Sequence, residues 1–196
     1  MGEVGGFSLT VPRRDGGERR LYLIETAEKA GLTPLKPFLA RIEALKDAKG
    51  LATEIGHMHA GIANPAFGFY VGQDDMDSTR YIAQFFQGGL GLPDRDYYTL
   101  EDAKSQDIRA KYLDHMARMF ELLGESKLLA KAHAGVVMGM ETRLAKASMT
   151  QVEQRDPHAI YHKMSPTELA KLAPGFPWDT FFQTLGLPEQ KALLVR

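Results

Sequence analysis

The sequence contains no cysteine, and this absence excludes disulfide bonds, catalytic thiolates and every zinc site built on cysteine ligands. It leaves the redox compartment open, because a cysteine-free domain can fold in either environment. The chain also lacks an excess of basic charge, since 24 Lys and Arg against 25 Asp and Glu give a net charge of −1. A nucleic-acid-binding surface needs a basic stripe, so we expect no nucleic-acid partner.

Long apolar runs are absent as well. No stretch of about 18 apolar residues occurs, so we expect no membrane span. The first residues do not show the basic segment and apolar run of a signal peptide, and the location is therefore unknown from the chain. What is present is a hydrophobic content of 44% over 196 residues, enough for one folded domain with an ordinary core.

The chain divides by composition near residue 20. Residues 1–19 are rich in glycine and arginine, and we predict a mobile N-terminal arm there. A basic tail for an acidic partner is the functional alternative for this arm. Residues 20–196 carry the patterning of a folded domain.

Apolar residues recur at helical spacing along most of this domain, which predicts a mainly α, multi-helix, bundle-like fold. The helical pattern begins at Glu18, and Thr33 and Asp179 are expected to cap later helices. Ser165 and Glu168 form a capping-box pattern. We expect helices at 21–31, from 33, and at 50–63, 100–123, 126–149, 165–172 and 179–185, then another turn at 188–194.

One small β-hairpin interrupts the helices. Residues 67–71 and 80–86 have strand-like composition, and Asp74 to Ser78 lies between them as a turn. The aspartates of this turn resemble the start of a calcium loop, but the Gly and Glu of an EF-hand do not follow at the required spacing. A hairpin turn is the better interpretation.

Histidines are the first side chains to consider as zinc ligands. His158 and His162 are four residues apart, which on a helix would place both imidazoles on one face, as in zinc peptidases. Ala159 stands where such an enzyme needs a glutamate base, and no third ligand is evident after His162. A metal-binding protein using this pair is a weak hypothesis.

Other catalytic patterns are missing. There is no Gly-x-Ser-x-Gly elbow, and the GGLG sequence at 88–91 lacks the Lys-Ser/Thr of a phosphate loop. Spacing alone therefore predicts only a mostly helical domain with no catalytic constellation.

Several segments together resemble one enzyme family. Residues 89–98 read GLGLPDRDYY, close to the GLGLP-x-RDYY signature of the N-terminal helical domain of M13 (neprilysin-like) zinc metallopeptidases. The motif residues are Gly89, Leu90, Gly91, Leu92, Pro93, Arg95, Asp96, Tyr97 and Tyr98. Segments similar to the family follow the same order: FGFYV at 67–71, ETRLAKA at 141–147, RDP at 155–157, YHKM at 161–164 and F-x-W at 176–178. The resemblance spans residues 21–185, with His162 in place of the family's usual Asn.

The resemblance also implies what these residues do not supply. In the family, zinc and catalysis come from a C-terminal His-Glu-x-x-His and a downstream Glu-x-x-x-Asp, and neither motif occurs in this sequence. We therefore assign no catalytic, metal or substrate-contacting residue here, and expect zinc only in an intact enzyme. The family's helical domain caps the catalytic domain and encloses a chamber that admits short peptides. Its members are usually periplasmic or extracellular.

The resemblance thus predicts a partial M13-type helical domain at 20–196, non-catalytic, inactive alone and partnered by an M13-type catalytic domain. The motif residues are expected to be structural: Arg95 pairing with Asp94 or Asp96, and Tyr97 and Tyr98 anchoring the loop through area and hydroxyl groups. The alternative is a stand-alone truncated interaction module with no peptidase role, marked by an exposed apolar patch.

Overall fold

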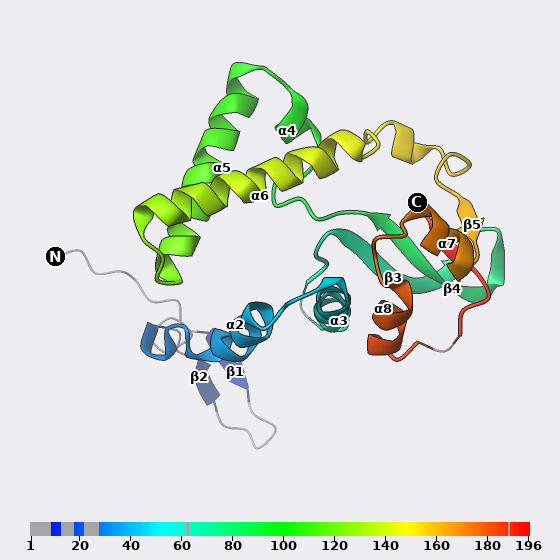
Figure 1. Ribbon diagram of the computed structural model, residues 1–196, viewed down its shortest axis with the longest axis horizontal. Coiled ribbons are helices and arrows are strands. Elements are labelled where there is room, and N and C mark those ends of the chain that lie inside the picture. The colour runs from blue at the N-terminus through cyan, green and yellow to red at the C-terminus, as the bar shows by residue number, and fades with distance from the viewer. Residues whose placement is uncertain (1–8, 13–17, 22–27, 62, 188) are drawn as a thin grey trace. The chain divides into compact units, whose positions relative to one another are not determined.

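A computed structural model describes residues 9–12, 18–21, 28–61, 63–187 and 189–196. The chain forms two compact units, Met1–Ala44 and Leu45–Arg196. The fold is mainly α with a small sheet, as the sequence predicts. Figure 1 shows the elements along the chain.

The first unit holds short elements. Strands β1 (Leu9–Pro12) and β2 (Glu18–Leu21) pair antiparallel. The predicted start of a helix at Glu18 is therefore wrong, because Glu18 to Leu21 pair across a hairpin that helical periodicity does not reveal. The rest of the predicted mobile arm, residues 1–8 and 13–17, lies outside the described residues, and its mobility stays a prediction.

The helix predicted from Thr33 begins differently. Thr33 is the first residue of the 3-10 turn η1 (Thr33–Leu35), with no side-chain cap, and α2 (Lys36–Glu43) follows it. The proposed N-cap at Thr33 is wrong because the turn already begins at that residue. The apolar stripe of α2 is not buried, since Leu35 is 47% and Ile42 43% exposed.

The second unit is built around a four-stranded sheet with the order β3-β4-β6-β5. Strands β3 (Phe67–Asp74) and β4 (Asp77–Gln87) form the predicted hairpin. Strand β6 (Leu193–Val195) adds parallel to β4, and β5 (His162–Met164) adds antiparallel to β6. The sheet is thus larger than the single hairpin expected, and β6 occupies the segment expected to form another turn.

Three helices contribute to the main core against one face of this sheet. They are α3 (Ala48–His59), α7 (Pro166–Leu172) and α8 (Trp178–Thr184). Phe85, Phe181 and Trp178 lie at its centre with ring centroids 5.5 to 6.2 Å apart. The capping box of α7 is present, whereas α8 begins after Pro177 and Asp179 lies in its first turn, so the predicted Asp179 cap is wrong.

Two long helices form an antiparallel pair, α5 (Ala103–Leu122) and α6 (Lys127–Ala147), visible in Figure 1. Asp102 and Ser126 cap their N-termini, and Gly124, at φ +102°, sits in the turn between them. A short helix, α4 (Asp96–Thr99), contacts both. The sequence motif runs from the connection after β4 into α4, and the contacts of α4 position it against the helix pair.

Candidate functional site

The motif segment, Gly89–Tyr98, contains glycines that allow close backbone packing. Gly89 has a φ of +77°, and a Cβ there would lie 2.7 Å from the Cα of Ala66. At Gly91 a Cβ would lie 1.9 Å from the hydroxyl of Tyr112 and 3.3 Å from a carboxylate oxygen of Glu141. Both positions require glycine, the first for conformation and space and the second for space alone.

Tyr98 fixes the segment to the helices through a buried polar network. Its hydroxyl donates to Glu141 Oε2 at 2.6 Å and accepts from the Leu92 backbone N–H at 2.8 Å. The Tyr112 hydroxyl, from α5, donates to Glu141 Oε1 at 3.0 Å. Tyr98 is 4% and Glu141 9% exposed. Glu141 thus joins the segment, α5 and α6 in one satisfied cluster.

Both tyrosines are held in their protonated form. Burial, together with the hydrogen bond to Glu141, raises the pKa of Tyr98 far above its ordinary value of 10. Burial and the nearby Glu141 charge raise the pKa of Tyr112 to about 12. Neither hydroxyl can serve as a base near neutral pH, and both act as hydrogen-bond donors to the carboxylate.

The charged residues of the segment also bond inward. Arg95 donates from Nε to the Ala145 carbonyl at 3.1 Å and lies 3.6 Å from Asp96, one of its two expected partners. Asp94 instead accepts from the Asp96 backbone N–H at 2.8 Å. The backbone carbonyl of Tyr97, rather than its hydroxyl, receives a bond from Arg109 of α5 at 2.9 Å.

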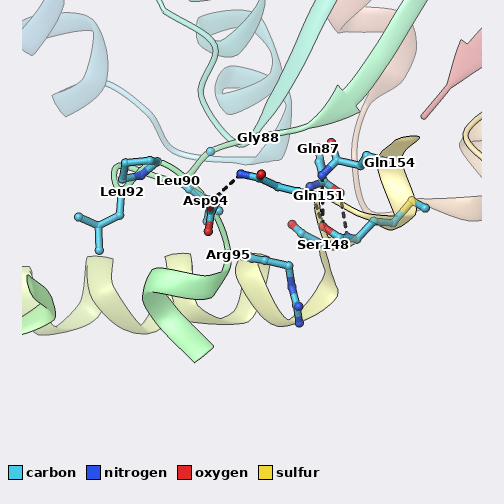
Figure 2. A pocket seen from close by; sticks show the side chains of 12 residues that line it. Gln87, Gly88, Leu90, Leu92, Asp94, Arg95, Ser148, Gln151 and Gln154 are labelled. Atoms are coloured by element: carbon cyan, nitrogen blue, oxygen red, sulfur yellow. Dashed lines mark hydrogen bonds between the residues drawn. The ribbon is translucent and has the colours of Figure 1, made fainter. Parts of the chain in front are cut away.

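An open pocket of about 420 Å³ lies beside the motif segment. Figure 2 shows Gln151 reaching Asp94, at 2.8 Å, while the Arg95 side chain points toward α6. Gln87 binds both the N–H and the carbonyl of Met149, at 2.8 and 3.1 Å. The lining comes from two stretches, Gln87–Arg95 and Ser148–Gln154. Gln87 and Gln151 bond across these two stretches, and Gln154 bonds within the second, so the pocket wall is braced.

A second polar cluster lies at the C-terminal end of β3, and the spacing of residues in the sequence does not predict it. Asp74, 2% exposed, accepts from the Tyr161 hydroxyl at 2.7 Å and from Lys163 Nζ at 2.6 Å. These bonds outweigh burial and lower the pKa of Asp74 to about 2. The hairpin turn predicted at Asp74 is present, but the residue's main partners lie almost 90 positions along the chain.

The histidine pair does not come together on a helix. His158 lies in a turn after Asp156, and His162 begins strand β5. Within the described ranges no group of three His, Cys, Asp or Glu side chains is placed to hold a metal ion. No ligand set for zinc is therefore assembled among the residues that the structure describes.

Comparisons with known proteins agree with the motif. A sequence profile of the N-terminal part of peptidase family M13 matches residues 22–196. The chain belongs to peptidase family M13. Neprilysin-3 of Drosophila melanogaster is 31% identical over 81% of the chain, and human endothelin-converting enzyme 1 is 36% identical over 64% of it. The chain spans 21% and 16% of those two M13 relatives.

A solved structure shows the same fold. The zinc metalloprotease Zmp1 of Mycobacterium tuberculosis, in complex with an inhibitor, is 36% identical and matches with a TM-score of 0.81. The match covers 88% of this chain and 26% of Zmp1. The M13 resemblance inferred from GLGLPDRDYY is thus confirmed, and these residues correspond to about a quarter of that protease.

Among the helices of the described residues, none is both long and apolar enough to cross a membrane.

Proposed function

We propose that this chain is the non-catalytic helical part of an M13-type zinc endopeptidase that acts on short peptides. It caps a catalytic domain encoded outside these residues and restricts access to the active site by its shape. The zinc, the peptide substrate and a location outside the cytoplasm belong to this proposal for the intact enzyme.

The observation that carries the proposal is that polar side chains of the family motif form hydrogen bonds within the protein. The Tyr98 hydroxyl and the Glu141 carboxylate bond one another in a buried cluster, and Arg95 bonds the α6 backbone. A substrate-binding motif would direct such groups toward an open pocket. Inward bonding instead supports a rigid wall, which is what exclusion by shape requires.

Peptide hydrolysis tests the non-catalytic part of the proposal. The purified chain, with added zinc, is incubated with internally quenched peptides, and Zmp1 serves as the active control. We expect no cleavage above the buffer rate. Cleavage that a chelator abolishes and zinc restores would show that this chain contains its own catalytic site, and the proposal would fail.

The size of the natural product tests the partner. An antibody raised against this chain is used on an extract of the source organism. We expect a band about three to four times the mass of this chain, because relatives are about three to four times its length. A single band at the mass of the 196 residues would instead support the stand-alone interaction module.

A further inference from the structure

Helix α6 has two apolar faces, and only one of them is covered in the unit Leu45–Arg196. Ala130, Ala134 and Ala145 face α4 and α5 and are at most 1% exposed. The opposite side, which we call the outer face of α6, is formed by Leu128, Ala132, Gly135, Val136, Gly139 and Met140, all of them exposed. At 3.6 residues per turn Arg143 and Lys146 fall on the same side, so the outer face is apolar from Leu128 to Met140 and basic beyond it.

The apolar part of the outer face combines large exposed side chains with small residues. Leu128 is 84%, Val136 60% and Met140 52% exposed. A Cβ added at Gly135 or Gly139 would meet nothing within 4 Å. Ala132 and these two glycines recur every three or four residues and so form a shallow groove along the helix. Such a groove lets a second helix approach closely with large side chains in the depressions.

Charge defines the partner further. The exposed charged residues of α6 are all basic: Lys127, Lys131, Arg143 and Lys146. The helix's one acid, Glu141, is buried on the other side with Tyr98. Among the residues that the structure describes, neither Arg143 nor Lys146 has an acidic partner. A helix seated on the outer face would gain most from acidic side chains that reach these basic residues.

We infer that the outer face of α6 is the docking groove for an amphipathic helix with large apolar and acidic side chains. The helix is supplied by the part of an M13-type polypeptide outside these residues, since the chain covers 26% of its solved relative. The origin of the helix rests on the proposed function, whereas the groove and the chemistry of its partner do not. The glycine-lined groove argues against a membrane surface, which large apolar and aromatic side chains would bind better.

Binding of synthetic peptides tests the groove without any peptidase assay. The probe is a 21-residue helical peptide, the length of α6, with a leucine stripe flanked by glutamates. The matched peptide carries lysines at the flanks. We expect the glutamate peptide to bind the 196-residue chain about tenfold more tightly or better in fluorescence anisotropy. Equal affinity of the two peptides would overturn the proposal.

Glycine substitutions separate binding from folding. The variant Gly135→Ala/Gly139→Ala places methyl groups in the groove but improves helix propensity, so the melting temperature should rise by a few degrees. We expect the same variant to lose about tenfold in affinity for the glutamate peptide, as should Val136→Lys. Gly175→Ala, another glycine with open space around it, is the control and should bind normally. Unchanged affinity in the double variant would overturn the groove.

The same experiments also distinguish two other occupants of the outer face. If the chain forms a dimer that Val136→Lys dissociates in light scattering, a second copy occupies the face and the proposal is wrong. If vesicles of anionic phospholipid bind the chain and the glutamate peptide does not, the face is a membrane surface and the proposal is likewise wrong. Because neither readout uses hydrolysis, failure here leaves the proposed function standing.

Discussion

At Gly91 the backbone passes so close to Tyr112 that even one added methyl group has no room. A Cβ would lie 1.9 Å from the hydroxyl oxygen and 2.7 Å from the ring carbon that carries it. The ring cannot easily move away, because its hydroxyl is bonded to Glu141. We therefore expect Gly91→Ala to lower the free energy of unfolding by about 1–3 kcal/mol in urea denaturation.

A double-mutant cycle identifies the cause at Gly91. Tyr112→Phe removes the closest atom, so Gly91→Ala should cost less in that background than in the natural chain. Gly139→Ala is the control, because its methyl group would meet open space and the change should be neutral or stabilising. Equal costs of Gly91→Ala in the two backgrounds would show that the hydroxyl is not the obstacle.

Asp74 makes the stability of the fold depend on acid pH. Its pKa is lowered from 3.8 to about 2 by the bonds from Lys163 and Tyr161. A lowered pKa contributes stability above the unfolded value, so this contribution is complete above about pH 5 and is lost as the pH falls toward 2. We expect about 2 kcal/mol of the free energy of unfolding to disappear over that range.

The variant Asp74→Asn should be less stable at pH 7 and should show a flatter decline between pH 5 and 2. Asp107→Asn is the matched control, since Asp107 is 57% exposed in an i, i+4 pair with Lys111 and should change stability by less than about 0.5 kcal/mol. The role given to Asp74 is contradicted if its variant retains the full acid-dependent decline measured by urea titration.

At the scale of elements, local signals predicted best. Helices α5 and α6 follow from apolar spacing within a few residues, and the capping box of Ser165 and Glu168 follows from its sequence pattern. Thr33 and Asp179 failed as caps because a residue of the right type within two positions of a proline can equally lie inside the first turn. Side-chain type identifies a helix terminus only to within one or two positions.

How well a strand could be predicted depended on how far its partner lies along the chain. The β3–β4 hairpin was predictable because its partners adjoin, although its strands are longer than expected. Strand β6 was not, because Leu193 is opposite Ala83, and three residues give no periodicity of their own. The bonds of Asp74 could not be predicted for the same reason, because Tyr161 precedes β5 and Lys163 lies on it, both far from Asp74 in sequence. A single sequence shows which residues are adjacent along the chain, whereas these contacts join residues that meet only in the folded chain.

At the scale of the whole molecule, the sequence indicated a candidate segment but not its contacts. Family resemblance singled out GLGLPDRDYY, and the structural role expected of its residues stays a prediction. This segment is held by the buried Glu141 carboxylate of α6, which accepts hydrogen bonds from Tyr98 and Tyr112. Those bonds can be seen only once the fold has placed Glu141 and Tyr112 beside Tyr98. Resemblance therefore indicated the segment, and only the three-dimensional arrangement shows which residues it bonds.

The last residues of the chain complete the sheet, and this arrangement leads to the largest expected effect. Leu193 and Leu194 are fully buried, and β6 is the link between β4 and β5. Truncation of a buried leucine costs about 2–5 kcal/mol, and a whole domain is stable by only about 5–15 kcal/mol. A chain ending at Ala192 should therefore lose its cooperative urea transition and the near-ultraviolet circular dichroism of the Phe85–Trp178 cluster. Arg196→Ala, which keeps the strand backbone, should retain both signals. A cooperative transition at an unchanged midpoint in the shortened chain would show that β3 and β4 hold the core without β6.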